Sequence, residues 1–410
     1  MSNLFVGIDV SSRKNVVHFM KPDGSKVSSF SVDNNFNGAK LLVVKISEAL
    51  SALSFNTVTI GLEATSVYGD NLVFFLRGSS ELSAFNPSIH VLNPKQVKKF
   101  KDAYPDLPKN DPVDAFVIAD ALRFGRITNE IYTQDYRYQA LKNLTRARFF
   151  AVQSLTKEKQ RFMNYIFMKF SSMAQNKIFS DSFGASALAL YTEFDSVEEL
   201  AAMSLEDLTV FLRTNGNNRF PDPEAVAKTI QAAVRSSYRL PKTVADAINQ
   251  ILALSVVSMR SLKEQIKSFD KAIEQQLQVI PNTLTSVKGI GLVYSAGIIA
   301  EVGDIKRFPN HAALAKYAGL TWTQHQSGNY EAQNTRLINS GNRFLKYYLT
   351  EAAYSLVRCD AEFKRYFNLK KAEVNRGQGK RALALTARKL VRLVFALLKD
   401  NRLYIPSEVY

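Results

Sequence analysis

Residues 4–9 read LFVGID, an apolar run that ends in a carboxylate, and this stretch decides the expected fold. Such a run is typical of a buried strand that presents an acid where it ends. Residues 58–63, VTIGLE, repeat the form and end in Glu63. Three strands followed by alternating strands and helices predict a mixed sheet with helices on its faces. The further segments expected in this part are strands at 15–20, 26–32 and 89–93 and helices at 37–50 and 71–77.

Four acids in this part are candidate metal ligands. Asp9 and Glu63 end strands, and Asp111 and Asp114 stand at the head of a helix, where i, i+3 spacing places both on one face. Clustered carboxylates suit Mg²⁺, which takes oxygen ligands, and they suit phosphodiester chemistry. Each acid also has a structural interpretation: Asp9 starting a turn, Glu63 leaving a strand, Asp111 as a helix N-cap before Pro112, and Asp114 complementing the helix dipole. Taken together, their order favours a metal site of the ribonuclease-H type.

Two nucleotide-binding classes are excluded by missing glycine-rich motifs. Sugar kinases and actins share the opening strand, but there a glycine-rich phosphate turn follows the first acid, whereas residues 10–13 read VSSR. The chain also has no G-x-x-x-x-G-K-[ST] loop, so the expected chemistry does not use ATP.

The composition predicts a nucleic-acid partner. Lys and Arg number 53 against 37 Asp and Glu, a formal net charge of +16 that attracts phosphate backbones. No apolar run approaches the roughly 18 residues of a membrane span, and the N-terminus does not resemble a signal peptide, so we expect a soluble cytoplasmic protein with no membrane partner. The single cysteine, Cys359, excludes an internal disulfide and a cysteine-rich zinc site, and four histidines argue against a histidine zinc site.

Basic charge is concentrated in two segments. Residues 361–402 hold twelve Lys or Arg against three acids, and residues 137–169 hold eight against one. A basic helix face is often only solvated, so each segment alone is weak support for binding. The candidate nucleic-acid contacts in the first segment are Lys380, Arg381, Arg388 and Lys389.

The length predicts two to three domains, which we place at residues 1–134, 135–280 and 281–410. The middle part is expected to be helical. Apolar residues recur at threes and fours from Met259 to Ile280, as in a coiled-coil seam, and an earlier helix within 141–170 could pack against it. A plain helical bundle and an oligomerisation arm are equally compatible with this pattern.

The last part is expected to be mostly helical and holds two further motifs. Residues 287–296, VKGIGLVYSA, resemble a helix-hairpin-helix turn, in which Lys288, Gly289 and Gly291 would contact a phosphate through backbone N–H groups and charge. Residues 319–330, GLTWTQHQSGNY, contain a Ser-Gly pair that in a polar loop is most often a turn. A basic helix expected after this loop adds three candidate phosphate contacts, Arg336, Arg343 and Lys346.

Several short motifs share one order along the chain and carry a family resemblance. At the front they are GID at 7–9, GLEAT at 61–65, NP at 93–94 and NDPVDA at 110–115, and at the back KGIG at 288–291, AGL at 318–320, QSG at 326–328 and SGN at 340–342. In these motifs the chain resembles the DEDD transposases of bacterial insertion elements, the insertion sequence 110 family, whose relatives include a pilin-segment invertase.

The resemblance implies a fold and a reaction. The N-terminal domain would be similar to RuvC resolvases, with Asp9, Glu63, Asp111 and Asp114 as the tetrad that holds Mg²⁺. The C-terminal domain would carry Ser327 as the nucleophile that attacks a DNA phosphate, leaving a phosphoserine link and a free 3′-hydroxyl. A serine needs a base or a metal beside it to act in this way.

The resemblance also implies partners. Members of the family bind donor and target DNA and a structured guide RNA, the bridge RNA, and the chain would assemble as a dimer or tetramer. Two features depart from the family pattern: Asn329 follows the Ser-Gly pair, and the helical part from about 135 to 280 is longer than usual.

Three alternatives remain open at this point. A RuvC-like junction resolvase or nuclease would direct water with the tetrad and would not need Ser327. A protein-guided DNA invertase would bind DNA without a guide RNA. A non-enzymatic binding protein would keep the acids for structure and would bind nucleic acid with a steep salt dependence.

Overall fold

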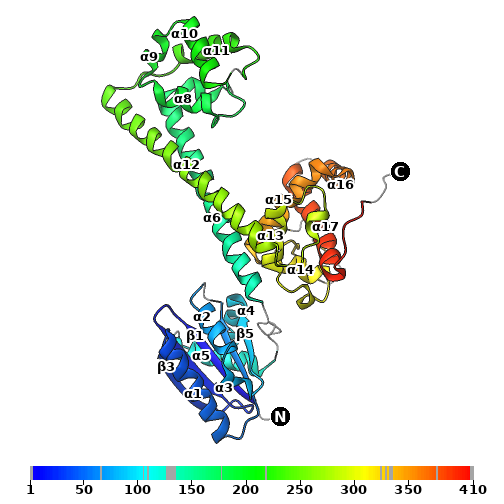
Figure 1. The fold of residues 1–410 in the computed structure, drawn as a ribbon. Helices are drawn as coiled ribbons and strands as arrows, with labels where there is room; N and C mark the ends of the chain where they lie inside the picture. The colour runs from blue at the N-terminus through cyan, green and yellow to red at the C-terminus, as the bar shows by residue number, and fades with distance from the viewer. Residues whose placement is uncertain are drawn as a thin grey trace. The chain divides into compact units, whose positions relative to one another are not determined.

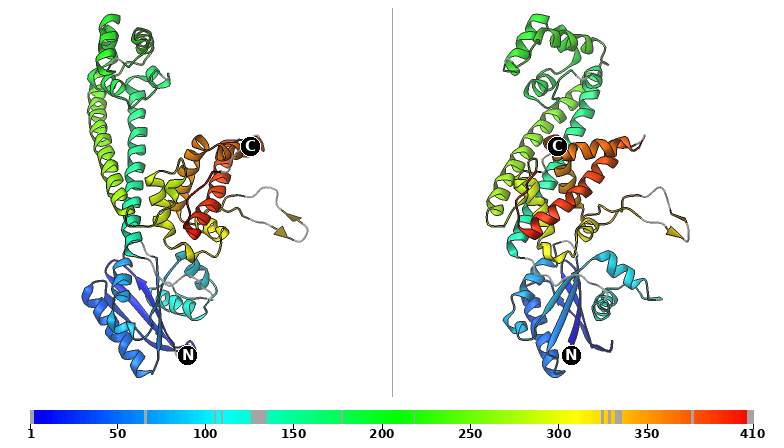
Figure 2. Two further views of the ribbon diagram at one scale, coloured as in Figure 1. Left: turned by 45° about the vertical axis from the view of Figure 1, so that its right-hand side comes forward. Right: turned by 90° about the vertical axis from the view of Figure 1, so that its right-hand side faces the viewer.

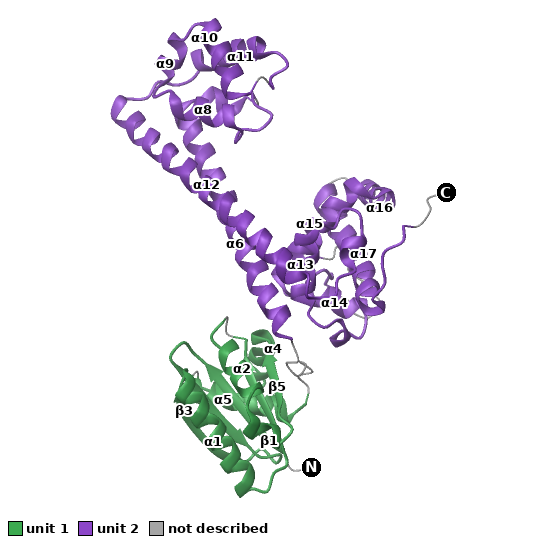
Figure 3. Cartoon of the chain, in the orientation of Figure 1, with its two compact units in different colours: residues 1–134 green, residues 135–410 purple. Residues whose placement is uncertain are grey.

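The computed structural model describes residues 3–64, 67–104, 106–108, 110–125, 135–176, 178–217, 219–323, 326–327, 330–331, 336–374 and 377–406. The chain forms two compact units, residues 1–134 and 135–410 (Figure 3). The elements of unit 1 are β1 (Asn3–Val10), β2 (Lys14–Met20), β3 (Lys26–Asp33), α1 (Phe36–Ala52), β4 (Thr57–Glu63), α2 (Asp70–Arg77), α3 (Ser80–Ser83), β5 (Ser88–Leu92), α4 (Pro94–Lys101) and α5 (Asp111–Arg123) (Figure 1).

Unit 1 is built on a five-stranded mixed sheet of order β3-β2-β1-β4-β5. The first three strands form an antiparallel meander, while β1, β4 and β5 run parallel. This is the ribonuclease-H-like strand order, so the expected mixed sheet with helices is confirmed. The parallel ladder pairs Ile8 with Leu62, which brings the last residues of β1 and β4 to one edge of the sheet.

The two faces of this sheet are covered differently. On one face Leu4, Val6 and Ile8 are fully buried in a core shared with Leu42 and Ile46 of α1. On the other face two glycines allow α5 to lie against the strands. A Cβ added to Gly7 would lie 2.1 Å from the Ala115 carbonyl oxygen, and one added to Gly61 would lie 2.6 Å from Leu122 Cδ1. A residue with a side chain at Gly7 would therefore push α5 away from the sheet.

The described part of unit 2 is helical apart from the short β6–β7 hairpin and an isolated bridge between Trp322 and Leu337. Its elements are α6 (Tyr136–Lys169), α7 (Ser171–Gln175), α8 (Ala185–Glu193), α9 (Val197–Ala202), α10 (Leu205–Asn215), α11 (Pro223–Arg235), α12 (Lys242–Leu277), η1 (Leu284–Ser286), α13 (Leu292–Val302), η2 (Ile305–Arg307), α14 (His311–Tyr317), β6 (Gln326–Ser327), β7 (Tyr330–Glu331), α15 (Arg343–Cys359), α16 (Ala361–Ala372) and α17 (Gln378–Asp400).

Helices α6 and α12 pair along their length and run antiparallel (Figure 1). Arg148 near the start of α6 bonds Asp270 near the end of α12, while Phe162 and Met259 share a core at the opposite end of the pair. The predicted seam is present: Met259, Ile273 and Leu277 are buried, although Ile280 lies beyond the last residue of α12. The middle part is therefore helical, as expected from its periodicity.

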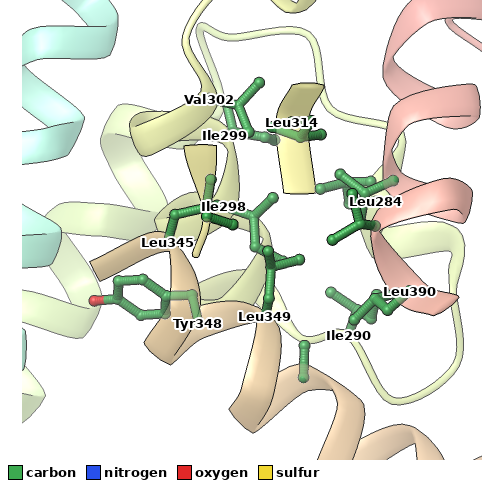
Figure 4. Packing of buried hydrophobic residues seen from close by; sticks show 14 of the residues in the cluster. Leu284, Ile290, Ile298, Ile299, Val302, Leu314, Leu345, Tyr348, Leu349 and Leu390 are labelled. Carbon is green, nitrogen blue, oxygen red and sulfur yellow. The ribbon is translucent and has the colours of Figure 1, made fainter. Parts of the chain in front are cut away.

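Unit 2 has two separate hydrophobic cores. One lies at the far end of the α6–α12 pair, where α7 to α11 form a small helical head (Figure 2). The other is formed by the start of α6, the end of α12 and helices α13 to α17, and it includes Ile298, Leu345 and Leu349 (Figure 4). Tyr348 belongs to this second core and donates a hydrogen bond to the Thr145 carbonyl of α6 at 2.7 Å. None of the described helices is long and apolar enough to cross a membrane.

Candidate active site

The sheet itself brings two of the four acids together. Asp9 follows Ile8 and Glu63 follows Leu62, so both acids directly follow the last registered pair of the parallel β1–β4 ladder. Side chains alternate along a strand, so Asp9 lies on the same face as Gly7 and Glu63 on the same face as Gly61. That is the face against which α5 packs. Both carboxylates are half-buried.

Helix α5 brings the other two acids to the same edge. Its first residue is Asp111, and Asp114 lies three residues later on the same face. Asn110 is the N-cap, and its side-chain oxygen accepts a hydrogen bond from the Val113 N–H at 3.0 Å. The interpretation of Asp111 as the cap is therefore wrong: the preceding asparagine fulfils that role and leaves the Asp111 carboxylate for other contacts.

The four carboxylates act on one another electrostatically. Burial together with the neighbouring charges of Asp111 and Asp114 raises the pKa of Asp9 to about 6. The pKa of Glu63 is also raised, first by burial and then by Asp9 and Asp114. Like charges that raise one another's pKa destabilise the free protein. Such a cluster is typical of a functional site, since turn and capping roles would not require the acids to converge.

A lysine that the sequence analysis missed belongs to this cluster. Lys101, the last residue of α4, donates from Nζ to Asp114 Oδ1 at 2.6 Å, and its charge opposes the rise in the pKa of Asp9. The side chains of Lys101 and Asp114 are 20% and 34% exposed, so the pair is partly shielded from water. Its only sequence signal is the run of basic residues in PKQVKKFK at 94–101, which does not identify the member that turns toward the acids.

The donor set fits a hard divalent cation, because it consists of carboxylates only and their mutual repulsion would be relieved by a positive ion. Within the described residues, however, no three acidic, histidine or cysteine side chains are already arranged as a ligand set. The Lys101 ammonium supplies the positive charge in the arrangement observed.

A third carboxylate on α5, which the sequence analysis also missed, has a structural role. Asp120 is buried and accepts a hydrogen bond from Arg123 Nε at 2.6 Å and another from the Tyr104 hydroxyl. Burial and this carboxylate raise the pKa of Tyr104 to about 12. Asp120 lies six residues beyond Asp114 and ties α5 to Tyr104 in the segment that follows α4.

Ser327 lies in unit 2, at the end of strand β6, where it pairs with Tyr330 of β7. Its backbone is described but its side chain is not, and His325, Gly328 and Asn329 lie outside the described residues. The segments that precede and follow this hairpin, 321–323 and 336–338, are joined by two hydrogen bonds. Thr323 N donates to Arg336 O at 2.8 Å, and Ile338 N donates to Thr321 O at 2.9 Å. Ser327 thus belongs to a short hairpin, and the described residues that precede and follow this hairpin are also hydrogen-bonded to each other.

Two glycines close the base of these paired segments. Gly319 and Gly341 both have positive φ, +71° and +117°, and a Cβ on Gly341 would lie 2.5 Å from the Gly319 nitrogen. The following residue, Asn342, donates from Nδ2 to Glu301 Oε2 at 2.6 Å. Glu301 is buried and is held by Arg146 of α6 through two hydrogen bonds of 2.6 and 2.9 Å. This network connects the end of the paired segments to α13 and α6.

The helix-hairpin-helix-like segment precedes α13. Lys288 is exposed, and Gly291 is the N-cap of α13 with nothing within 4 Å of the place that a Cβ would occupy. Gly289 has a φ of +106° and lies against Cys359 of α15. The segment thus leaves the N-terminus of α13 open and an exposed lysine beside it.

The remaining predicted nucleic-acid contacts differ in their exposure and in the hydrogen bonds that they already form. Arg343 and Lys346 are on the first turn of α15. Arg336 precedes that helix, and its carbonyl accepts a hydrogen bond from the Thr323 N–H, so its placement on a basic helix was wrong. On α17, Lys380 is exposed and Arg388 donates to the His311 carbonyl at 3.3 Å.

Two further residues of α17 are already ion-paired. Arg381 bonds Glu373 at 3.0 Å, and Lys389 bonds Glu362 at 2.5 Å. These carboxylates neutralise part of the basic charge of residues 361–402. The roles of these residues in nucleic-acid binding stay predictions.

Comparison with known proteins agrees with the geometry. A family model described as a transposase, of the DEDD type named for IS110, matches residues 6–167, and a model of the transposase IS116/IS110/IS902 family matches residues 282–368. The 43.6 kDa protein of insertion element IS110 from Streptomyces coelicolor is 25% identical over 98% of this chain and 95% of its own length. The 44.8 kDa protein of IS116 from Streptomyces clavuligerus is 28% identical over 76% of this chain and 77% of its own length.

A shorter match has a functional name. The transposase of insertion element IS1111A from Coxiella burnetii is 32% identical over 35% of this chain and 38% of its own length. The two matched model ranges together cover more than half of the chain, and they include both the strand and helix acids and the Ser-Gly segment. The chain belongs to the IS110/IS116 family of DEDD transposases, enzymes of DNA transposition.

Proposed function

We propose that this transposase cuts and rejoins DNA through a covalent phosphoserine intermediate, with Ser327 as the nucleophile and Asp9, Glu63, Asp111 and Asp114 as the ligands of Mg²⁺. The observation that supports the metal site is the convergence of carboxylates from two strands and one helix: burial and then Asp111 and Asp114 raise the pKa of Asp9 to about 6, and burial and then Asp9 and Asp114 raise the pKa of Glu63. A bound divalent ion would stabilise the negative charge that develops on the transferring phosphoryl group.

The chain's own residues divide the remaining work. The Ser327 oxygen attacks the phosphorus, so that a serine–phosphate ester forms as the bond to the 3′-oxygen breaks, and the serine proton ends on that oxygen. The free 3′-hydroxyl of another strand then reverses the step. Each step exchanges one phosphodiester for another, so no ATP is needed. The fixed base of the hairpin supports this role, because a nucleophile must be held in position.

A structured RNA encoded by the same element is the proposed guide, and a dimer or tetramer the proposed assembly. Both rest on the family resemblance, and the net charge of +16 is compatible with RNA and DNA together. The RuvC-like character of unit 1 and the phosphate-binding role of Lys288, Gly289 and Gly291 are proposed on the same basis.

A covalent trapping assay tests the nucleophile. Protein purified with its co-purifying RNA is incubated with labelled DNA that carries the ends of its element, and protein–DNA adducts are separated under denaturing conditions. Ser327→Ala should abolish the covalent adduct and slow strand cleavage by roughly a thousandfold or more, while binding of the DNA persists. Cleavage by this variant at the wild-type rate would remove Ser327 from the mechanism and favour a hydrolytic nuclease.

The tetrad is tested with Asp111→Asn, which retains the shape of the side chain but removes its charge. Cleavage should fall by roughly a thousandfold, while the melting temperature of the metal-free protein stays the same or rises because repulsion decreases. A fall in melting temperature with cleavage intact would show that Asp111 is structural.

Sequencing of the RNA that co-purifies with the protein tests whether an RNA guides it. A discrete species that maps beside the gene supports RNA guidance, and heterogeneous RNA favours a protein-guided invertase.

A further inference from the structure

An exposed aromatic ring on α6 lies beside the start of α15. Phe150 is 48% exposed, although phenylalanine is usually buried. Its ring centre lies 5.6 Å from that of Phe149 and 5.8 Å from that of Phe344, so neighbouring rings hold it in place. The guanidinium of Arg343 lies 5.5 Å from the centre of the Phe150 ring and 4.7 Å from that of Phe344. The ring is therefore supported by other rings, open to solvent, and adjacent to a cation.

A second pair of the same kind lies farther along α15. Tyr354 is 52% exposed, and the Arg358 guanidinium lies 4.8 Å from its ring centre. At 100° per residue, Arg343, Tyr354 and Arg358 share one face of the helix. With a rise of 1.5 Å per residue, the two arginines are about 20 Å apart along the helix axis. This distance corresponds to a few nucleotides of an extended single strand.

The charge of α15 favours an anionic ligand. The helix carries three basic residues, Arg343, Lys346 and Arg358, and one acidic residue, Glu351. Neither Arg343 nor Arg358 forms an ion pair with a carboxylate in the part of the chain that the structure describes. Other arginines of unit 2, such as Arg148, are neutralised by partners. The folded unit thus leaves these two cations for an external group.

We propose that this surface, defined by Phe150, Arg343, Tyr354 and Arg358, binds single-stranded nucleic acid. Bases stack on the two aromatic rings, and the two guanidinium groups contact phosphates. Base stacking on aromatic side chains is sequence-tolerant and needs an unpaired base, because the faces of bases in a duplex are already covered. The inference deepens the proposed function and rests on it, since strand exchange and a guide RNA both present unpaired nucleotides.

Binding of labelled oligonucleotides to the full-length protein tests this surface. The probes are oligo(dT) and oligo(rU) of about 20 nucleotides and a blunt DNA duplex of similar length, followed by fluorescence anisotropy. Phe150→Ala should weaken binding of a single strand about tenfold and change duplex binding less than about twofold. Phe150→Trp should restore it, because tryptophan keeps a stacking face. A loss with oligo(dT) alone assigns the surface to DNA, and a loss with oligo(rU) alone assigns it to RNA.

The matched control is Phe167→Ala, another exposed phenylalanine of α6, at 46% exposure, for which no cation contact is recorded among the described residues. It should leave all three affinities unchanged. Arg343→Gln should reduce the slope of log affinity against log salt by about one, as expected for a lost phosphate contact.

Three binding results and one change of assembly would overturn the inference. The binding results are single-strand affinity that Phe150→Ala leaves unchanged, an equal loss on duplex and single strand, and an equal loss with Phe167→Ala. A change of oligomeric state in Phe150→Ala, measured by light scattering, would also overturn it and assign the surface to a second copy of the chain. The covalent trapping assay on the wild-type protein is independent of these measurements. An intact adduct with unaltered single-strand binding therefore rejects this surface alone, and a missing adduct rejects the proposed function.

Discussion

The acid site of unit 1 and the hairpin base of unit 2 are fixed by different kinds of interaction. In unit 1 the position of the acids follows from backbone geometry: two glycines that let α5 approach the sheet, and an asparagine that caps the helix. In unit 2 the hairpin base is held through side chains far apart in sequence, as in the hydrogen bonds that Arg146 and Asn342 donate to Glu301. Local geometry can be read from short motifs, whereas distant side-chain partners have no local signal.

The largest effect is expected at Gly7, where the close contact between α5 and the sheet can be tested directly. Gly7→Ala should destabilise unit 1 by about 3 kcal/mol or more, because the new Cβ would lie 2.1 Å from the Ala115 carbonyl oxygen and α5 would have to move. Chemical denaturation followed by circular dichroism measures the effect. Gly69→Ala is the control in the same unit, since its Cβ would meet only Leu62 Cδ1 at 4.0 Å. Equal stability of the two variants would mean that α5 is not held against the sheet as described.

The polar network of unit 2 is tested with Arg146→Met. Glu301 has no exposed side-chain surface, so loss of its partner leaves a buried carboxylate and should destabilise unit 2 by about 3 kcal/mol. Lys228→Met on α11 is the control. Lys228 and Glu224 pair at 2.8 Å with side chains that are 62% and 57% exposed, so loss of this lysine should leave the stability nearly unchanged. Similar losses in both variants would show that the network contributes no more than a surface pair.

Much of unit 1 could be predicted from the sequence, for reasons visible in particular residues. The runs that end in Asp9 and Glu63 have the apolar pattern of buried strands, and the i, i+3 spacing of Asp111 and Asp114 places both on one helical face. The choice of N-cap was wrong by one residue, because Asn110 and Asp111 are both good caps and only the structure shows which one accepts the hydrogen bond.

The contacts that sequence reasoning missed are long-range. Lys101 was one of several lysines in a basic helix, and nothing local shows that its ammonium reaches Asp114. The helical pair of α6 and α12 followed from periodicity, but its pairing of Arg148 with Asp270 spans 122 positions. Arg336 was placed on a helix because basic residues follow it, whereas backbone pairing with Thr323 keeps it in the paired segment that precedes α15.

The head of unit 2 adds a pH-dependent test of the same contrast. Lys169 is buried, and burial lowers its pKa to about 8, with Asp195 and Glu199 opposing the shift. Its ammonium donates to the Tyr191 carbonyl at 3.0 Å. Because the pKa is lower in the folded protein than the usual 10.5, the unfolded chain binds more protons between pH 8 and 10.5. The destabilisation is therefore complete below pH 8 and is relieved as the pH rises.

Between pH 7.5 and 10, the free energy of unfolding of the wild-type protein should rise by about 2 kcal/mol relative to that of Lys169→Met. The measurement is the free energy of unfolding of both proteins across this range, since the difference between them removes the titration of other groups. Parallel curves would mean that Lys169 is not desolvated as the structure indicates.

The smallest expected effect concerns Lys101 and the proposed metal site. The Lys101 ammonium offsets part of the negative charge of the acids in the observed arrangement, with its Nζ 2.6 Å from Asp114 Oδ1, so a divalent cation has to compete with it. Lys101→Met should lower the melting temperature of the metal-free protein, since four carboxylates lose their counter-charge, and should tighten Mg²⁺ binding about tenfold at low salt. Titration calorimetry measures the affinity, and Lys99→Met, an exposed lysine of the same helix, is the control. Unchanged or weaker Mg²⁺ binding in Lys101→Met would show that this lysine does not compete for the acids. It would then be better explained as part of the fold, and unit 1 would contain a long-range polar contact of the kind that holds unit 2.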